Sequence, residues 1–376
     1  MDPGALFRIL VVNPGSTSTR AAFFRGETGQ AITTLPAPRS DSFADLWDEF
    51  PSRLEAIREW LGQQGIEKAE LSAVVGRGGL LRPVEGGTFL VTEAMLADAR
   101  GNRQGSHASN LGCALARALA DEATRDRAKL SQKEMAEVPL SAGAVPAFVV
   151  DPVSTDEFGE LARYSGLPEI PRRSLSHALS IHALVQEVCK RAGRGVEGSR
   201  FVVAHLGGGI SVCPVCDGRI LDANNANSGG PFSPTRAGGL PTQELLALCF
   251  SGKYTLRELK EMTVMRGGLV SYLGTDDARE VEGRIEGGDV EARRVYEAMA
   301  YQIAKEIGAM ATVLNGKVER VLLTGGLAAS DLLTAWIRER VGFLAPVEVW
   351  PEVEEMKALA LGALRVLKGE IQAKEY

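Results

Sequence analysis

A run of small hydrogen-bonding residues, NPGSTST, follows an apolar stretch near the N-terminus. Gly15 lets the backbone bend, so that backbone N–H groups and the side chains of Asn13, Ser16 and Ser18 can converge. Such a concentration of donors suits a polyphosphate or a metal-bound phosphate. The run is not a Walker loop, because no Lys-Ser or Lys-Thr pair follows a GxxxxG pattern. The sequence therefore predicts a phosphate-binding tip of another kind.

Two glycine-rich segments in the second half of the chain are further candidates. Gly207, Gly208 and Gly209 have no side chains, so a bulky anion can approach the main chain closely. Gly325 and Gly326 follow a predicted strand and precede a predicted helix, a position that suits the sugar or base of a nucleotide. A glycine pair after a strand is also typical of an ordinary tight turn, and the residues alone leave both interpretations open.

Two arginines lie in rigid surroundings. Arg236 lies within NSGGPFSPTRAGGLP, residues 227–241, where two Gly-Gly pairs and three prolines make a stiff loop. Arg77 lies between glycines in VVGRGG, directly after a predicted strand. A fixed guanidinium can hold planar charge against carboxylate or phosphoryl oxygens. A solvated loop arginine is the alternative interpretation for each.

Carboxylates supply candidates for a metal or for substrate orientation. Asp151 ends the apolar run AFVV, and a carboxylate at a strand end is well placed for Mg²⁺. Asp277, with Asp276 before it, lies in YLGTDDARE. Glu354 and Glu355 lie at the start of the last predicted helix, where charges are commonly solvated instead.

Histidines and cysteines narrow the chemistry. His107 lies in the polar loop NRQGSHASN and could reach a phosphate, and His177 and His205 lie beside candidate segments. Cys213 and Cys216 have the spacing of half a zinc site or a redox pair, but there is no second CxxC. We predict structural cysteines, because ISVCPVCDGRI reads as a strand that enters a turn. Without GxSxG or HExxH, serine and zinc hydrolases are disfavoured.

Length and charge exclude other classes of protein. The 376 residues, with 42 Lys and Arg against 48 Asp and Glu, carry a formal charge of −6, which argues against binding nucleic acid through a broad basic surface. No apolar run approaches the roughly 20 residues of a membrane helix, and no basic stretch precedes the short apolar segment at the N-terminus. We expect a cytoplasmic protein that binds neither nucleic acid nor a membrane.

The elements that must position these residues alternate between strands and helices, which predicts an α/β protein. Residues 7–12 and 20–24 flank the first tip, and residues 201–206 and 210–215 flank Gly207–Gly209 in the same way. This repetition at half the chain length predicts two similar halves, although two unrelated hairpins would also fit. Other predicted strands are 71–75, 147–150, 320–324 and 346–350. Predicted helices begin at Pro51, after a capping Ser176, at Asp289 and near residue 352.

Together these motifs resemble butyrate kinases, in the acetate kinase group of the superfamily that includes sugar kinases, actin and heat-shock chaperones. The match runs from about residue 7 to 360 and includes HASNLG, VDPVSTDEF, RRSLSHAL and LLTGGLAAS. The NPGSTST tip and the PTRAGG loop are specific to acid kinases. One departure is Arg20, where acetate kinases carry Lys.

The resemblance implies two ribonuclease-H-like domains of actin-like ATPase fold around a central cleft, each with a five-stranded sheet. The expected domains are residues 1–150 with the C-terminal helix 352–376, which bind the acid, and residues 151–351, which bind the nucleotide. The implied catalytic residues are Arg77, Asp151, Arg236 and His107. The implied nucleotide-binding residues are Asn13, Ser16, Ser18, Arg20, Gly207, Gly208, Gly209, Asp277, Arg279, Gly325 and Gly326. The implied metal-linked residues are Asn13, Asp151 and Glu354, with Glu355 as a rival to Glu354.

The resemblance also implies ATP or ADP and Mg²⁺ as cofactors, and a homo-oligomer, dimeric or larger. The expected reaction is reversible transfer of a phosphoryl group from ATP to a short-chain fatty acid, giving an acyl phosphate. A branched acid such as isobutyrate, or acetate or propionate, is an alternative substrate to butyrate. A sugar kinase, with Asp151 as base, or a nucleotide-dependent chaperone is the alternative of a different class.

Overall fold

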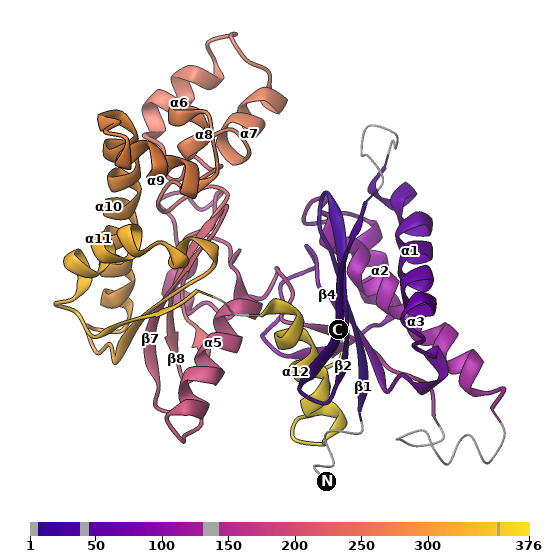
Figure 1. Ribbon diagram of the computed structural model, residues 1–376. Coiled ribbons are helices and arrows are strands. Elements are labelled where there is room, and N and C mark those ends of the chain that lie inside the picture. The colour runs from indigo at the N-terminus through magenta and orange to yellow at the C-terminus, as the bar shows by residue number, and fades with distance from the viewer. Residues whose placement is uncertain (1–6, 38–44, 131–142, 352–353) are drawn as a thin grey trace. The chain divides into compact units, whose positions relative to one another are not determined.

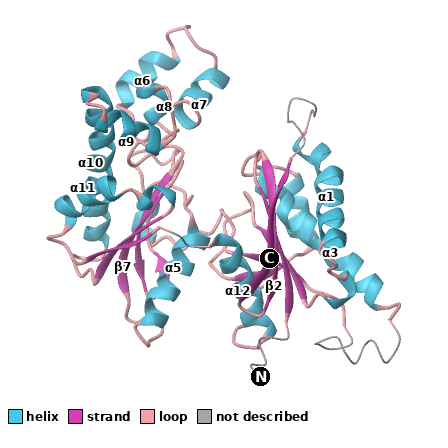
Figure 2. Ribbon diagram, in the orientation of Figure 1, coloured by secondary structure: helices cyan, strands magenta, loops and turns pink. Residues whose placement is uncertain are grey.

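The computed structural model describes residues 7–37, 45–130, 143–351 and 354–376. The chain forms two compact units: unit 1 is Met1–Thr155 with Glu354–Tyr376, and unit 2 is Asp156–Val353. Each unit is one sheet with helices on both faces, so the α/β class is confirmed (Figures 1 and 2). Within the described ranges, every helix is too short or too polar to cross a membrane.

The sheet of unit 1 has the strand order β3-β2-β1-β4-β6-β5. Its strands are β1 (Arg8–Pro14), β2 (Ser18–Arg25), β3 (Thr28–Pro36), β4 (Ala73–Arg77), β5 (Thr88–Leu90) and β6 (Ala147–Val150). β4 pairs in parallel with β1 and β6, and the other pairs are antiparallel. The expected five strands are wrong for this unit, because the chain adds β5 at the edge. Backbone hydrogen bonds of Lys374 to Thr88 (2.8 Å) and Leu90 (3.0 Å) cover that edge.

The sheet of unit 2 repeats the same topology in the order β11-β10-β7-β8-β9. Its strands are β7 (Arg200–Leu206), β8 (Ile210–Cys216), β9 (Arg219–Ile220), β10 (Arg320–Thr324) and β11 (Val347–Trp350). In both units the first strand of an antiparallel three-stranded meander pairs in parallel with one later strand, and that strand pairs in parallel with a second later strand. The two halves predicted from the repeated tips are therefore confirmed.

Helices cover both faces of each sheet. Unit 1 has α1 (Phe50–Gln63), α2 (Glu93–Arg100), α3 (Leu111–Arg127) and α12 (Glu355–Leu367). Unit 2 has α5 (Ala178–Arg191), α6 (Thr242–Cys249), α7 (Leu256–Val264), α8 (Gly268–Leu273), α9 (Ala278–Glu286), α10 (Val290–Val313) and α11 (Asp331–Val341). The predicted helix start at Asp289 is confirmed, since Asp289 is the N-cap of α10 and its side chain accepts from the N–H of Ala292. The predicted Ser176 cap is wrong: α5 starts one residue later than such a cap requires, and its N-cap is His177.

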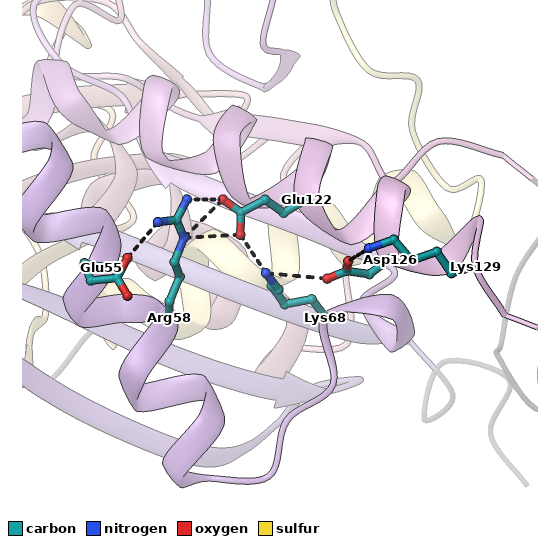
Figure 3. Close-up of polar contacts among 6 residues, drawn as sticks. All are labelled: Glu55, Arg58, Lys68, Glu122, Asp126 and Lys129. Atoms are coloured by element: carbon teal, nitrogen blue, oxygen red, sulfur yellow. Dashed lines mark hydrogen bonds and ion pairs between the residues drawn. The ribbon is translucent and has the colours of Figure 1, made fainter.

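A polar cluster joins the helices on one face of unit 1 (Figure 3). Glu122 on α3 accepts hydrogen bonds from Arg58 on α1 at 2.5 Å and from Lys68 at 2.7 Å. Burial alone would raise the pKa of Glu122, but the two cations outweigh it and hold that pKa below its ordinary value. The cluster therefore ties α1 to α3 at the rim of an apolar core. That core includes the predicted helix face Leu54, Ile57, Trp60 and Leu61.

Candidate functional site

Three predicted site residues of unit 1 lie at the carboxyl ends of neighbouring parallel strands. Val12 on β1 pairs with Gly76 on β4, and Arg77 pairs with Val150 on β6. Asn13, Arg77 and Asp151 therefore follow one another along one edge of the sheet, about one strand spacing (~4.8 Å) apart. This is the edge at which open α/β sheets bind ligands.

Arg77 is a buried cation, with 7% of its surface exposed. Helix α3 packs closely against β4, the strand that ends at Arg77. Glycine allows this approach, since a Cβ added at Gly112 would lie 2.1 Å from the carbonyl oxygen of Arg77. In the part of the chain that the structure describes, the buried Nη1 of Arg77 has no hydrogen-bond partner. A buried guanidinium with an unsatisfied N–H costs free energy unless an anion binds it. Arg77 is therefore arranged to receive an anionic ligand.

Asp151 is held in a strained conformation at the end of β6. Its φ of 39° is left-handed, which costs a non-glycine residue about 1 kcal/mol. Its Oδ1 accepts a hydrogen bond from the N–H of Gly87 at 2.7 Å, and its own N–H donates to the carbonyl of Gly87 at 3.0 Å. These two bonds fix the carboxylate at the site edge. Strain of this kind clusters at functional sites.

Asn13 contacts the start of the last helix. Its Nδ2 donates to Oε2 of Glu355 at 3.2 Å, whereas Glu354, the N-cap of α12, is exposed. Of the two rival glutamates, the structure thus brings Glu355 to the predicted tip. Asn13, Asp151 and Glu355 offer the oxygen donors that Mg²⁺ prefers.

These donors could bind a magnesium ion only together with a ligand that supplies the remaining oxygen atoms. Within the described segments, no three His, Cys, Asp or Glu side chains are grouped to hold a metal. Mg²⁺ commonly keeps several waters and uses one or two carboxylates together with substrate phosphates. The residues around Asn13 match a site of this kind, in which substrate phosphates complete the coordination of the ion.

The NPGSTST tip is held from behind by an arginine that the sequence analysis missed. Arg53 on α1 is 2% exposed, and it donates to the carbonyl oxygens of Gly15 at 2.9 Å and Ser18 at 3.3 Å. Glu49 balances its charge at 2.7 Å. The available signal was an arginine on the apolar face of a helix, four residues before Ile57.

The predicted side chains of the tip are open to solvent to different degrees. Ser16 is exposed and Ser18 is half-buried. Arg20 is exposed and lies opposite Asn13 in the antiparallel pair of β1 and β2. Of these three side chains, the strand pairing thus places that of Arg20 beside Asn13.

His107 lies on a segment that is fastened to the turn after Arg77. Its Nδ1 accepts from the N–H of Ser109 at 3.2 Å, which leaves the proton of the neutral ring on Nε2. Asn110, which is fully buried, accepts from the N–H of Leu80 at 2.8 Å. Asn110 thus links the His107 segment to the Arg77 segment.

In unit 2, the two glycine segments lie side by side at the end of the sheet. Thr324, the last residue of β10, pairs with His205 on β7, so the segments that follow both strands start at the same level. Gly325 has a φ of 89°, and a Cβ there would lie 2.4 Å from the carbonyl oxygen of Leu206. Gly325 is therefore required for the close approach to the strand that leads into Gly207.

Arg236 lies directly against Gly209. A Cβ added at Gly209 would lie 2.3 Å from Nη1 and 2.4 Å from Cζ of Arg236. The hydroxyl groups of Ser233 and Thr235 donate to the carbonyl of Gly208 at 2.5 Å and 3.0 Å. The stiff loop is thus clamped onto the glycine tip. Burial lowers the pKa of Arg236, so this guanidinium is partly desolvated, although an arginine stays charged.

Two histidines stack beside the same tip. The rings of His177 and His205 are 4.0 Å apart with an interplanar angle of 15°. Nδ1 of His177 lies 2.9 Å from Oγ of Ser211. A Cβ at Gly207 would lie 3.4 Å from Nε2 of His205. The sequence placed each histidine beside a candidate segment but gave no sign of the stack, because the two are 28 residues apart.

Asp277 and Arg279 pair with each other at the start of α9. Asp277 caps the helix, and the hydrogen bond from the Arg279 side chain holds the pKa of its carboxyl below the ordinary value. Glu282 on the same helix accepts from Ser330 Oγ at 2.5 Å. Since Ser330 follows the Gly325-Gly326 segment, α9 is tied to the predicted nucleotide motif.

Cys213 and Cys216 are free and form neither a disulfide nor a chelating pair. Both lie on β8, and residues three apart on a strand point to opposite faces of the sheet. The predicted strand at this segment is therefore confirmed, and the structural role of the two cysteines stays a prediction.

Comparisons with known proteins agree on one family. The model of the acetokinase family matches residues 169–344. "Probable butyrate kinase 2" of Caldanaerobacter subterraneus subsp. tengcongensis is 47% identical over 99% of this chain and 100% of the relative. "Probable butyrate kinase" of Listeria monocytogenes serotype 4a is 45% identical over 98% of this chain and 99% of the relative.

Solved structures share the fold. Acetate kinase from Porphyromonas gingivalis has a TM-score of 0.76 at 17% identity, over 96% of this chain and 100% of that one. A propionate kinase from Francisella tularensis has a TM-score of 0.70 at 17% identity, over 95% and 98%. The two-unit α/β architecture described above is thus the architecture of these kinases.

Proposed function

The chain belongs to the acetokinase family, and from this premise we propose that it transfers the γ-phosphoryl group of ATP reversibly to a short-chain fatty acid. The proposed acid is butyrate, as in the names of its relatives, and the products are butyryl phosphate and ADP. Mg²⁺, a cytoplasmic location and a homo-oligomer complete the proposal, as the resemblance implies.

One observation carries this proposal: the buried guanidinium of Arg77, whose Nη1 has no partner in the described segments, lies between Asn13 and Asp151 on one sheet edge. An anion there would remove the cost of an unsatisfied buried charge. Both an acid substrate and the phosphoryl group that it receives are such anions. Support for a second fixed cation comes from the clamp of Arg236 onto Gly209.

The chemistry requires positioning and charge neutralisation more than proton transfer. A fatty acid is already ionised at neutral pH, so its carboxylate oxygen can attack the γ-phosphorus without a general base. The bond from that phosphorus to the β,γ-bridging oxygen breaks, and ADP leaves with the electron pair. Arg77 and Arg236 would neutralise charge on the transferring group in a loose, in-line transition state. When bound, Mg²⁺ would offset the charge of the nucleotide phosphates, with Asn13, Asp151 and Glu355 as the nearest protein donors.

The remaining residues divide between the two units in this proposal. Unit 1 would orient the acid and the reacting phosphoryl group, with His107 as a donor through Nε2. Unit 2 would bind the nucleotide through its glycine segments and through the start of α9. Those nucleotide-binding residues are Gly207, Gly208, Gly209, Asp277, Arg279, Gly325 and Gly326, with Ser16, Ser18 and Arg20 contributed by the tip of unit 1.

Hydroxamate trapping of acyl phosphate tests the proposal. The protein is incubated with ATP, Mg²⁺ and each straight-chain acid from acetate to valerate, with isobutyrate alongside, and with glucose and glycerol in parallel for ADP release. We expect hydroxamate with the acids, most with butyrate, and no ADP release with the sugars. Pocket contacts discriminate by about 1–3 kcal/mol per methylene, so neighbouring acids should react more slowly. ADP release with glucose and no hydroxamate would contradict the proposal.

A further inference from the structure

Residues 371–376, here called the tail segment, follow α12 and lie against the edge strand β5 of unit 1. Lys374 pairs in parallel with Phe89, the middle residue of β5. The N–H of Lys374 donates to the carbonyl of Thr88 at 2.8 Å, and its carbonyl accepts from the N–H of Leu90 at 3.0 Å. An edge strand presents backbone groups that its own sheet leaves unpaired, and Lys374 binds two of those on β5. The tail segment is therefore bound to the sheet itself.

The side chain of Lys374 reaches the turn that holds Asp151. Its Nζ donates to the carbonyl of Gly86 at 2.7 Å. It also lies over Gly87, since a Cβ added there would be 3.1 Å from Cε of Lys374. The two neighbours of Gly87 in the chain, Gly86 and Thr88, thus both accept hydrogen bonds from Lys374. Lys374 therefore fixes the backbone on both sides of Gly87.

Gly87 is the residue through which this support reaches the candidate site. Its φ of 138° lies in the range that favours glycine, and glycine loses more conformational freedom on folding than any other residue. Its N–H and carbonyl make the two hydrogen bonds to Asp151, at 2.7 Å and 3.0 Å. Asp151 is itself held at a left-handed φ. A shift of Gly87 is therefore passed directly to the carboxylate of Asp151.

Tyr376 fastens the tail segment at a second point. Its hydroxyl donates to Oδ2 of Asp98 on α2 at 2.9 Å and accepts from the N–H of Arg82 at 2.9 Å. The guanidinium of Arg82 lies over its ring, with Cζ 4.4 Å from the ring centre. Burial raises the pKa of Tyr376, so its hydroxyl keeps the proton that it donates at neutral pH. Residues 82–90 are therefore bound to the tail segment at both ends.

We propose that the tail segment is a positioning element for Asp151. Lys374 and Tyr376 hold residues 82–90 in place, and through Gly87 these residues hold the Asp151 carboxylate at the site edge. Every contact in this chain of support lies within unit 1. Lys374 and Tyr376 act through Gly87, so they are positioning residues and not catalytic ones. The effect on turnover rests on the proposed kinase function, whereas the effect on Gly87 and Asp151 does not.

Amide hydrogen exchange, resolved by NMR, tests the positioning directly. One variant is a chain that ends before Lys374. The other is the full chain with Lys374→Met and Tyr376→Phe together, which keeps the backbone bonds to β5 and so keeps the sheet edge covered. A hydrogen bond contributes a factor of about 2–12 to an opening equilibrium, so the N–H groups of Gly87 and Asp151 should exchange at least about tenfold faster in both variants. The N–H groups of β1 should exchange as in the wild type.

Two controls show whether the effect is specific. Glu375→Ala changes an exposed residue between the two anchors, and it should leave the exchange of Gly87 and Asp151 unchanged. Lys374→Arg keeps a donor for the carbonyl of Gly86 and should restore most of the protection that Lys374→Met loses. Unchanged exchange at Gly87 and Asp151 in both test variants would overturn the proposal. Equal acceleration in β1 would also overturn it, because the tail segment would then stabilise unit 1 as a whole.

Turnover in the hydroxamate assay is the second readout. In the double variant we expect kcat to fall about 10–100-fold while KM for ATP and butyrate changes less than about twofold, since misplacement by about 1 Å can cost about 100-fold in rate. In an Asp151→Asn background the same substitutions should cost nothing further. Additive losses would refute the route through Asp151. A wild type that makes no hydroxamate, with the exchange of Gly87 changed in the variants as expected, would instead refute the proposed function and leave the anchoring by the tail segment standing.

Discussion

The substitution Gly209→Ala tests how Arg236 is positioned without touching the arginine itself. The added Cβ would lie 2.3 Å from Nη1 of Arg236, whereas ordinary contact begins at 3.4 Å, so the guanidinium must move by at least 1.1 Å. Gly209 is not among the residues of positive φ, so its backbone accepts alanine. The guanidinium is the far end of a flexible side chain, so the protein should still fold. Misplacement by about 1 Å can cost about 100-fold in rate.

We therefore expect kcat in the hydroxamate assay to fall about 100-fold while the free energy of unfolding barely changes. Gly208→Ala adds the same methyl group one residue earlier, where the nearest atom is Thr235 Oγ1 at 3.9 Å. Gly208→Ala is therefore the control: any loss of activity in it measures the effect of an added methyl group on nucleotide binding without displacement of Arg236.

A double-mutant cycle decides whether the loss passes through Arg236. Arg236→Ala alone should lower kcat by about 10²–10³, as removal of a group that stabilises transition-state charge does. If Gly209→Ala acts by displacing the guanidinium, it should cost nothing further in the Arg236→Ala background. Additive losses, or near-normal turnover in either single variant, would refute this reasoning.

Three other predictions concern the framework of unit 1 and the buried thiols. Glu122→Gln should lower the free energy of unfolding at neutral pH by about 1–3 kcal/mol in urea titrations, and Asp121→Asn on the exposed surface by less than about 0.5. Because the pKa of Glu122 is lowered in the folded state, its contribution is present above the ordinary carboxyl pKa and is lost as the pH falls through the lowered value, so a deficit that persists in acid would contradict this origin. Arg53→Lys keeps the charge but loses the guanidinium hydrogen bonds to the carbonyls of Gly15 and Ser18, so it should weaken ADP binding about tenfold in calorimetry. Unchanged affinity would contradict the prediction that the NPGSTST tip binds phosphate. Burial raises the pKa of Cys113 to about 12 and that of Cys213 further, so mass spectrometry should find both unalkylated by iodoacetamide until the protein is unfolded.

Local pattern predicted the strands that flank the candidate tips, several helices and much of one site edge, but it did not predict β3, β5, α2, α3 or α6–α9. Strand ends could be read from apolar runs, and Asn13, Arg77 and Asp151 each follow or end such a run. Their alignment depends on the register between β1, β4 and β6, which sequence spacing does not contain. Repeated tips favoured a duplicated topology without excluding two unrelated hairpins, and the structure shows that each unit opens with the same meander.

Contacts between distant segments could not be predicted in this way. Glu355 reaches Asn13 because α12 returns to unit 1 over 342 residues of chain, and one register step separates it from Glu354. The support of the tip by Arg53 arises from the angle at which α1 packs, and the stack of His177 on His205 from the meeting of α5 with β7. The exposure of α6 could not be predicted either, because its sequence TQELLALC has the composition of an ordinary buried helix.

The central claim is that two fixed guanidinium groups receive the phosphoryl group as a carboxylate attacks it. The most direct measurement is a crystal structure with butyrate, Mg²⁺, ADP and aluminium fluoride as a mimic of the transferring group. We predict that Arg77 and Arg236 each place a guanidinium nitrogen about 2.7–3.1 Å from the fluoride ligands. A complex in which either side chain points away from the fluoride, or in which butyrate lies out of line with the aluminium, would contradict the claim.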